Sequence, residues 1–302
     1  MQHITDVTNL QLHDTAVALG KFDGFHRGHQ LLMNQVKRWQ NQGFTGVIFT
    51  FAEAGQAIGA AKHIDSFTEK VHKAEQMGVQ VLLEYPFTKE FAGLEPEAFV
   101  TEVLIRQLDV KAVAVGRDFR FGRARSGDAE LLVQLGNKYG FQVQVFDKLK
   151  EQQEEISSSV IRNAIVNGQM KLVSNYMGKG YSVYGEVIHG KGLGHTIGIP
   201  TANQMIPKEK LVPPLGVYAV QIHWKEQIYS GISNLGCKPT VTAEEIPGLE
   251  TYIFDFNQDI YGEWLEVELV HYIRPEQKFE NLDVLIAQMK TDIEKAKTVL
   301  NV

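Results

Sequence analysis

The hydrophobic pattern of the chain changes character near Tyr181, and this change limits the folds that the chain can adopt. Residues 15–147 alternate short apolar, β-branched runs with amphipathic segments, a pattern that predicts a parallel sheet covered by helices. From Tyr181 onward, strand-like runs follow one another with Gly and Pro turns between them, which is typical of a small antiparallel barrel. The expected fold class is therefore α/β, with a doubly wound parallel-sheet domain followed by a small antiparallel β-barrel and a C-terminal helix at Leu282–Leu300.

The periodicity also places the individual elements. In the first part, strands are expected at Thr15–Leu19, Thr45–Phe51, Gln80–Glu84, Lys111–Val115 and Phe141–Phe146. Helices are expected at His29–Gln40, Thr68–Met77, Pro96–Gln107 and Ala129–Tyr139, the last capped by Ser126 or Asp128. Strands of the barrel are expected at Tyr181–Ile188, Gly216–Trp224, Gln227–Asn234, Thr251–Phe256 and Trp264–Ile273. Ligands of doubly wound sheets bind beyond the carboxyl ends of the strands, so the loops after Leu19 and Val115 are the expected sites of chemistry.

Charge is distributed unevenly along the 302 residues. Lys plus Arg and Asp plus Glu number 20 each in residues 1–180, whereas 10 basic residues face 16 acidic ones in residues 181–302, so the net charge of −6 lies in the second part. This asymmetry favours two domains, as does the length. Neither part is basic enough to predict a nucleic-acid partner.

The chain shows no sign of a membrane or extracellular location. No stretch approaches the roughly 18 apolar residues that a membrane helix needs, so neither a transporter nor another membrane partner is expected. The single cysteine, Cys237, cannot form an internal disulfide, which fits the reducing cytoplasm. We therefore expect a cytoplasmic protein.

Residues 18–29 run from a strand end through a glycine-rich loop into a helix start. The glycines allow close approach of a ligand, and the helix start offers free N–H groups to an anion. His26 and His29 share that helix start and could donate hydrogen bonds to a phosphoryl group. A solvated turn and half of a metal site are the alternatives, but no cluster of further metal ligands is visible nearby, so we favour a phosphate site.

Two further segments contain residue types that often bind phosphate, but the residue types alone do not establish this role. The four glycines between residues 190 and 198 could wrap phosphates or form a plain hairpin, because their spacing matches neither the Walker A nor the dinucleotide pattern. The serines and the arginine of residues 156–162 could hold phosphate at a helix start, or the serines could simply cap the helix.

Three motifs of the first part resemble one family. Gly-x-Phe-Asp-x-x-His-x-Gly-His at 20–29 resembles the signature of the nucleotidylyltransferase superfamily, in its bacterial flavin-adenylating branch. Val-Gly-Arg-Asp-Phe-Arg-Phe-Gly at 115–122 resembles the flavin and nucleotide loop of that branch, and Ile-Ser-Ser-Ser-Val-Ile-Arg at 156–162 resembles its ATP-triphosphate segment. The resemblance implies catalytic roles for His26 and His29. It implies nucleotide or phosphate contacts for Gly20, Phe22, Asp23, Gly28, Ser157, Ser158 and Arg162, and flavin contacts for Asp118, Phe119 and Phe121.

The second part resembles riboflavin kinases. Pro-Thr-Ala-Asn at 200–203 closely resembles their metal-nucleotide motif, which implies that Thr201 and Asn203 hold Mg²⁺ against the phosphates of ATP. Stretches at 214–220, 231–240, 249–256 and 259–262 continue the resemblance. It implies that Glu250 is the general base, although the residue type alone favours an exposed glutamate. It also implies flavin contacts for Asn234 and Arg274, and nucleotide contacts for Gly190, Lys191, Gly192 and Gly194. Tyr252 and Phe254 are either flavin walls or core residues.

Both resemblances point to the bacterial bifunctional riboflavin kinase/FMN adenylyltransferase (FAD synthetase) family. They imply a transferase with an FMN adenylyltransferase domain at residues 1–178 and a riboflavin kinase domain at residues 179–302. The implied reactions are phosphorylation of riboflavin to FMN and adenylation of FMN to FAD with release of pyrophosphate. ATP is the implied co-substrate and Mg²⁺ the implied cofactor. The expected partners are the small molecules riboflavin, FMN and ATP, and the expected assembly is a monomer or a weak homo-oligomer.

Two departures from the family pattern leave alternatives open. After Phe51 the chain reads Ala-Glu-Ala-Gly-Gln where the family has Phe-x-Pro-His-Pro, and His195 stands where the kinases carry an arginine. A titratable group in place of a permanent cation predicts weaker nucleotide binding by the kinase. A chain with only one active half, and a non-catalytic flavin or nucleotide sensor, are the remaining alternatives.

Overall fold

The structure is a computed structural model that describes residues 1–52, 62–190, 199–239 and 245–302. It contains two compact units. Unit 1 comprises Met1–Ala61 and Phe67–Ser158, and unit 2 comprises Lys62–Ser66 and Ser159–Val302. The helices α6 (Ser158–Val166) and α7 (Met170–Met177), which follow the first sheet in the chain, group with unit 2 apart from Ser158.

Unit 1 is built on a six-stranded sheet in the order β1-β4-β3-β2-β5-β8, and every neighbouring pair is parallel. The strands are β1 (Gln2–Ile4), β2 (Thr15–Leu19), β3 (Thr45–Ala52), β4 (Val81–Pro86), β5 (Val110–Gly116) and β8 (Gln142–Phe146). The five expected strands are confirmed with ends shifted by at most two residues. The strand β1 was not expected, because its three residues are too few and too polar to show a period.

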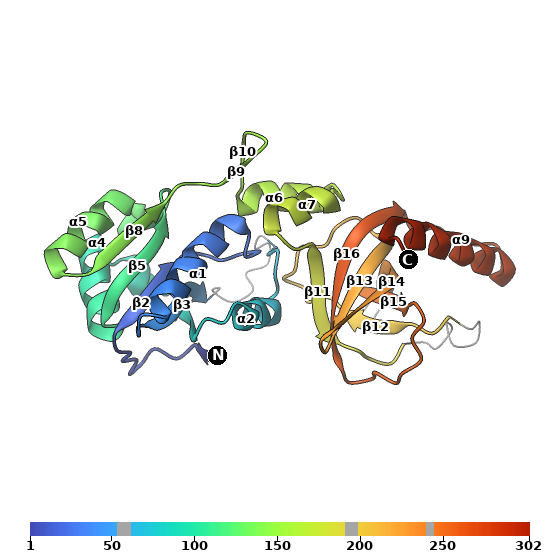
Figure 1. Cartoon of the computed structure of the whole chain (residues 1–302), viewed down its shortest axis with the longest axis horizontal. Helices are drawn as coiled ribbons and strands as arrows, with labels where there is room; N and C mark the ends of the chain where they lie inside the picture. The colour runs from blue at the N-terminus through green and yellow to red at the C-terminus, as the bar shows by residue number, and fades with distance from the viewer. Residues whose placement is uncertain (53–61, 191–198, 240–244) are drawn as a thin grey trace. The chain divides into compact units, whose positions relative to one another are not determined.

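Helices cover both faces of this sheet (Figure 1). One face carries α1 (Arg27–Gln40) and α2 (Phe67–Gln76), which share a core cluster with Ala16, Ile48 and Ala114 of the strands. The other face carries the π-helical η1 (Phe99–Gln107) and α5 (Ala129–Tyr139), which share a second cluster with the alternate strand residues. The strands are buried on both faces because helices lie on each side, which explains their continuous apolar runs.

Short elements complete unit 1. They are α3 (Lys89–Ala92), α4 (Pro96–Ala98), η2 (Arg123–Arg125) and the paired strands β6 (Arg120–Phe121) with β7 (Gly127–Asp128) and β9 (Lys150–Glu151) with β10 (Glu154–Glu155). Of the two expected caps of α5, Asp128 takes the role, since its Oδ1 accepts the N–H of Leu131 at 2.9 Å.

Unit 2 contains a six-stranded antiparallel sheet in the order β11-β16-β13-β14-β15-β12. Its strands are β11 (Tyr181–Glu186), β12 (Ala202–Met205), β13 (Gly216–Trp224), β14 (Gln227–Pro239), β15 (Glu245–Ile253) and β16 (Trp264–Arg274). The two edges of the sheet approach each other at Gln204, whose Nε2 donates to the carbonyls of Gly185 in β11 and Leu265 in β16. A bridge between Ile188 and Asn203 joins the same edges, so the expected barrel is confirmed.

The C-terminal helix α9 (Leu282–Leu300) begins and ends where the sequence predicts. Asn281 caps it, because its Oδ1 accepts the N–H of Val284 at 3.0 Å. In unit 2 the helix lies alongside the barrel strands (Figure 1), and its Ala296 packs against Val217, Ala219 and Ile232.

The segment Lys62–Ser66 comes from the first half of the sequence but belongs to unit 2. His63 lies beside Lys210 in a parallel bridge, and its backbone exchanges hydrogen bonds with Glu209 and Leu211. Ile64 is fully buried, and its carbonyl accepts the Nζ of the equally buried Lys210 at 3.0 Å. The second unit is therefore not assembled from a single continuous stretch of chain.

Candidate active sites

The loop between β2 and α1 is held in place by its phenylalanines. Phe22 and Phe25 are almost fully buried with ring centroids 6.1 Å apart, and both take positive φ angles, +48° and +41°. Their burial in the core under α1 offsets the cost of this backbone conformation. The anchored loop brings the two histidines to the first turn of α1.

His26 caps α1. Its Nδ1 accepts the N–H of His29 at 3.3 Å, and the two imidazole rings stack with centroids 3.6 Å apart. Gly28 leaves space for this pair, because a Cβ at this position would lie 3.1 Å from the His26 ring and would force the ring to shift. The predicted pair of histidines is thus brought together at a helix N-terminus, where backbone N–H groups and the helix dipole favour an anion.

Both histidines are neutral at neutral pH. Burial lowers the pKa of His26 to about 4, against the opposing effect of the Asp118 carboxylate. Burial is the largest cause that holds the pKa of His29 well below its ordinary value, and the electrostatic effects of the neighbouring His26 ring and of Lys70 lower this pKa further. Since Nδ1 of His26 accepts a hydrogen bond, its proton sits on Nε2, which makes Nε2–H the available donor.

The serine segment reaches the same loop. Ser158 Oγ donates to the carbonyl of Asp23 at 2.9 Å, across 135 positions of sequence, and Ser157 precedes it at the start of α6. Asp23 is itself 5% exposed. Gly20 joins the end of β2 to the loop, with its N–H bonded to the carbonyl of Phe49 in β3. Arg162 lies further along α6, and its phosphate contact stays a prediction.

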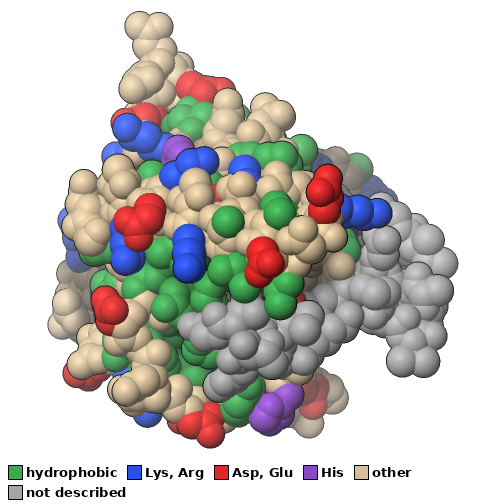
Figure 2. Space-filling model, turned by 90° about the vertical axis from the view of Figure 1, so that its right-hand side faces the viewer, with side chains coloured by type: hydrophobic (Ala, Val, Ile, Leu, Met, Phe, Trp, Pro, Cys, Tyr) green, Lys and Arg blue, Asp and Glu red, His purple; other side chains and the backbone are tan. Residues whose placement is uncertain are grey.

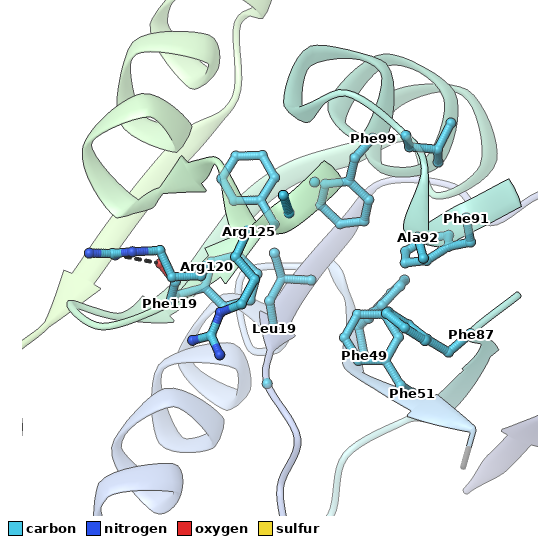
Figure 3. Close-up of a pocket in the computed structure, with 15 residues that line it drawn as sticks. Leu19, Phe49, Phe51, Phe87, Phe91, Ala92, Phe99, Phe119, Arg120 and Arg125 are labelled. Carbon is cyan, nitrogen blue, oxygen red and sulfur yellow. Dashed lines mark hydrogen bonds between the residues drawn. The ribbon is translucent and has the colours of Figure 1, made fainter. Parts of the chain in front are cut away.

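Beside this loop lies a cavity of about 250 Å³ lined mainly by aromatic rings. Figure 3 shows Phe49, Phe51, Phe87 and Phe91 on one side of it and Phe119, Arg120 and Arg125 on the other. Phe119 and Phe121 stack with centroids 5.6 Å apart, and Gly20 also lines the space. Asp118 is exposed and lies 3.5 Å from Lys148 Nζ. Because Gly20 belongs to the loop that leads to the histidines, the cavity borders that loop.

The sequence motifs predicted two of the aromatic residues that line this cavity, Phe119 and Phe121, and missed the others. Phe49 and Phe51 lie at the carboxyl end of β3, and Phe87 and Phe91 follow β4. The signal that could have found them is the concentration of phenylalanine at neighbouring strand ends, which are ligand-binding positions in a parallel sheet.

In unit 2, three predicted residues from three strands form one row. Asn203 of β12 is paired with Glu250 of β15, which is paired in turn with Asn234 of β14. Directly paired residues of an antiparallel sheet point to the same face, with Cβ atoms about 5 Å apart. Asn203 is 5% exposed and Glu250 is half-buried. The structure thus brings together a predicted metal ligand, the predicted base and a predicted flavin contact.

Other predicted residues surround this row. Asn203 Nδ2 donates to the carbonyl of Thr201 at 3.2 Å. Thr201 also lines a cavity of about 430 Å³ with Pro200, Thr251 and Tyr261, although Thr251 points to the opposite side of β15 from Glu250. Gly190 lies against the Asn203 side chain with no room for a Cβ. Lys191, Gly192, Gly194 and His195 lie outside the described residues, as do Glu53–Gln56 of the departing segment in unit 1.

Arg274, Tyr252 and Phe254 have structural contacts. The guanidinium of Arg274 binds the buried Asp292 of α9 through Nε and Nη2, both at 2.8 Å, and Nη1 donates to the Pro275 carbonyl. Phe254 is 8% exposed in the cluster under α9, and Tyr252 packs against that cluster. Flavin contacts for these three residues stay predictions.

The donors near Asn203 suit a hard cation. A hydroxyl, an amide oxygen and a neighbouring carboxylate are the oxygen ligands that Mg²⁺ accepts alongside water and substrate phosphates. Among the described residues, no group of three or more His, Cys, Asp or Glu side chains could hold a metal ion. The chemistry of the residues therefore fits a metal that is shared with a nucleotide.

Comparison with known proteins matches each half separately. A model of the FAD synthetase family matches residues 8–160, and a model of the riboflavin kinase family matches residues 177–300. A curated bifunctional riboflavin kinase/FMN adenylyltransferase from Haemophilus influenzae is 34% identical over 299 residues, covering 97% of this chain and 96% of that protein. A protein of the same description from Bacillus subtilis is 36% identical over 306 residues, covering 97% and 96%.

A solved structure extends the likeness to the whole fold. A chain from Streptococcus pneumoniae described as a macrolide-efflux protein superimposes with a TM-score of 0.84 at 31% identity, covering 98% of this chain and 99% of that one. In the part of this chain that the structure describes, no helix has the length and apolar character needed to span a bilayer.

Proposed function

The chain belongs to the bifunctional riboflavin kinase/FMN adenylyltransferase family, and we propose that its two units divide the two reactions between them. Unit 2 converts riboflavin and ATP to FMN and ADP, and unit 1 converts FMN and ATP to FAD and pyrophosphate. The observation that carries the proposal is that each unit gathers its own set of polar residues from distant parts of the sequence, around Asn203 in one and around His26 in the other. The domain limits that we propose are residues 1–178 and 179–302.

In the kinase reaction, Glu250 accepts the proton of the ribityl 5′-hydroxyl as that oxygen bonds to the γ-phosphorus and the bond to the β-phosphate breaks. Asn234, the neighbour of Glu250 in β14, orients the flavin. Thr201 and Asn203 would hold Mg²⁺, which neutralises phosphate charge when bound. Gly190 allows the backbone to approach the nucleotide next to Asn203.

In the adenylation reaction, an FMN phosphate oxygen bonds to the α-phosphorus of ATP while pyrophosphate leaves. The Nε2–H of His26 and the ring of His29 donate hydrogen bonds to the phosphates, and the start of α1 adds its backbone N–H groups. Ser157 and Ser158 extend the phosphate site, and the phenylalanine cavity takes the flavin ring.

The experiment that tests the proposal follows the products. The protein is incubated with riboflavin, ATP and Mg²⁺, and riboflavin, FMN and FAD are resolved by chromatography. FAD is the expected product. FMN alone would limit the chain to a kinase, and no product at all would favour a flavin or nucleotide sensor.

Paired variants then separate the sites. His29→Ala is expected to reduce FAD formation from FMN by at least about a hundredfold and to leave FMN formation from riboflavin unchanged, because a charge-stabilising donor is lost from one unit only. Glu250→Gln is expected to show the opposite split, since it removes only the base. Loss of both activities in either variant would contradict the assignment of the two reactions to separate units.

We also propose that the protein acts in the cytoplasm as a monomer or a weak homo-oligomer. The support is the substrate chemistry, since all of the substrates are small and soluble, together with the lone Cys237. Size-exclusion chromatography with light scattering, in the presence of ATP and flavin, measures the assembly; a stable tetramer or larger ring would contradict it.

A further inference from the structure

The helices α1 and α2 begin at the same edge of the parallel sheet. Each connects a pair of adjacent parallel strands, β2 to β3 and β3 to β4, and the strand order β4-β3-β2 means that both crossovers run in one direction. Right-handed crossovers then place both helices on one face. Ala74 of α2 and Leu32 and Met33 of α1 confirm this, because they share one core cluster. The first turns of both helices therefore stand at the carboxyl edge of the strands, where ligands bind.

The first turn of α2 carries a lysine whose stem is buried. Lys70 is 6% exposed as a residue, and its Nζ makes no hydrogen bond or ion pair with a described residue. This atom is not one of the fully buried unpartnered atoms, so the ammonium group stays accessible at the edge of the sheet. Lys210, which is fully buried, differs because its Nζ donates to the Ile64 carbonyl and lies 4.4 Å from the Tyr181 ring centroid. A lysine with a buried stem and an accessible ammonium group at the ligand-binding edge of a sheet is placed to form charge-assisted hydrogen bonds with an anion.

The imidazole of His29 is a second incomplete group in this region. Its Nδ1 is buried and has no hydrogen-bond partner among the described residues. The charge of Lys70 acts on this ring, adding to burial and to His26 in lowering the pKa of His29. In the tautomer that carries its proton on Nδ1, His29 offers one donor and Lys70 a second, and neither has an acceptor among the described residues. A negatively charged group between the first turns of the two helices would satisfy both.

We propose that Lys70 is a phosphate-binding residue of the adenylation site, which contacts the β- and γ-phosphates of ATP and neutralises them as pyrophosphate leaves. This inference rests on the proposed function of unit 1. The FMN phosphate oxygen bonds to the α-phosphorus as the Pα–O bond to the β-phosphate breaks, and the electron pair of that bond stays with pyrophosphate. Lys70 transfers no proton in this step. Residues 52–56, which stand where the family pattern has a histidine, contain no basic side chain, so they offer no cation for this role.

The test measures pyrophosphate binding and turnover in the full-length chain. Lys70→Met is expected to weaken binding of inorganic pyrophosphate, measured by calorimetry, and to raise the ATP KM of FAD synthesis, each by about tenfold to a hundredfold, the value of one charge-assisted hydrogen bond. Lys70→Arg is expected to restore both to within a few-fold of wild type. FMN formation from riboflavin should stay unchanged in both variants and reports that the chain is folded.

Controls separate binding from structure. Lys37→Met removes an exposed lysine of α1 and should change neither quantity. If Lys70→Met does not fold, Lys70→Gln keeps a polar donor without the charge and takes its place. Wild-type pyrophosphate affinity in the uncharged variant would overturn the proposal, and so would loss of thermal stability in Lys70→Arg together with loss of both activities.

The proposed function fails in a different way. If the wild-type chain binds pyrophosphate but makes no FAD, the adenylation activity is absent, while the calorimetric comparison of Lys70→Met with wild type still decides whether Lys70 binds phosphate. If that comparison shows a loss that Lys70→Arg restores, the phosphate site stands without the reaction.

Discussion

His26 combines a structural and a chemical role in a single ring. As the cap of α1, its Nδ1 must be unprotonated to accept the N–H of His29, and burial keeps the ring neutral by lowering its pKa to about 4. The same arrangement directs the proton to Nε2, where a phosphate could accept it. The residue types alone predicted a phosphate site at these histidines, but the tautomer follows only from the cap geometry.

This buried histidine predicts a specific pH dependence of stability. The unfolded ring has a pKa near 6.5 and the folded ring near 4, so the unfolded chain binds the proton more readily between these values. The contribution of His26 to the free energy of unfolding is therefore fully present above pH 6.5 and is lost as the pH falls towards 4. At pH 5 the loss from this residue is expected to be about 2 kcal/mol.

Urea unfolding at pH 7.5 and at pH 5 measures this effect, with His26→Gln as the comparison. The variant lacks the cap at both pH values. Its free energy of unfolding should therefore fall less between pH 7.5 and pH 5 than that of wild type, by about 2 kcal/mol. An equal drop in the two proteins would show that the ring does not titrate as expected.

At the scale of elements, register decides which residues meet. In β15, Glu250 and Tyr252 point to the face that α9 covers, while Thr251 points to the opposite side, where its Oγ1 lies 2.7 Å from Ser233 Oγ. The expected strand Thr251–Phe256 placed Glu250 just before its start. The observed strand begins at Glu245, because the ladder with β14 extends past the glycine and proline that suggested a turn.

The segment Lys62–Ser66 gives a prediction at this scale. Ile64 is fully buried in a segment of unit 2, so Ile64→Ala is expected to destabilise that unit by about 2–5 kcal/mol. Thermal inactivation of riboflavin phosphorylation should therefore shift to lower temperature than inactivation of FMN adenylation, although residue 64 lies in the first half of the sequence.

Val47→Ala is the matched control for this experiment. Val47 is fully buried in β3 of unit 1, so its truncation should affect adenylation first. If Ile64→Ala and Val47→Ala inactivate the two reactions in the same order, the assignment of Ile64 to the stability of unit 2 is wrong.

At the scale of the whole molecule, charge and function are distributed unequally. Residues 181–302 carry the whole net charge of −6 and must nevertheless bind ATP. On the face drawn in Figure 2, acidic and basic side chains are interspersed and neither sign forms a continuous patch. Phosphate binding in unit 2 should accordingly depend on Mg²⁺ and on backbone N–H groups rather than on a basic surface.

Metal removal tests this dependence. Because the oxygen donors at Thr201 and Asn203 fit a metal shared with ATP, EDTA is expected to abolish FMN formation without lowering the melting temperature of the nucleotide-free protein. Excess Mg²⁺ should restore the activity fully. A melting temperature that falls with EDTA would reveal a structural metal and contradict the assignment.

The sequence by itself determined the kinds of element and the motifs that they carry. The period of apolar residues predicted the β2, β13 and α9 boundaries without error, because periodicity and capping are local properties of a few turns or strand residues. The motifs likewise predicted the family, which the comparisons confirm.

Tertiary structure alone decided which residues meet. The row of Asn203, Glu250 and Asn234, the ring of phenylalanines around the cavity, and Lys70 at the edge that carries His29 all depend on strand order and register. The placement of Lys62–Ser66 also depended on tertiary structure. The sequence pattern predicted that this segment belongs to the first domain, whereas in the structure it packs in unit 2. The physical reason is that the burial of whole sheet faces brings together residues that are far apart in sequence. A short stretch of sequence does not contain that information.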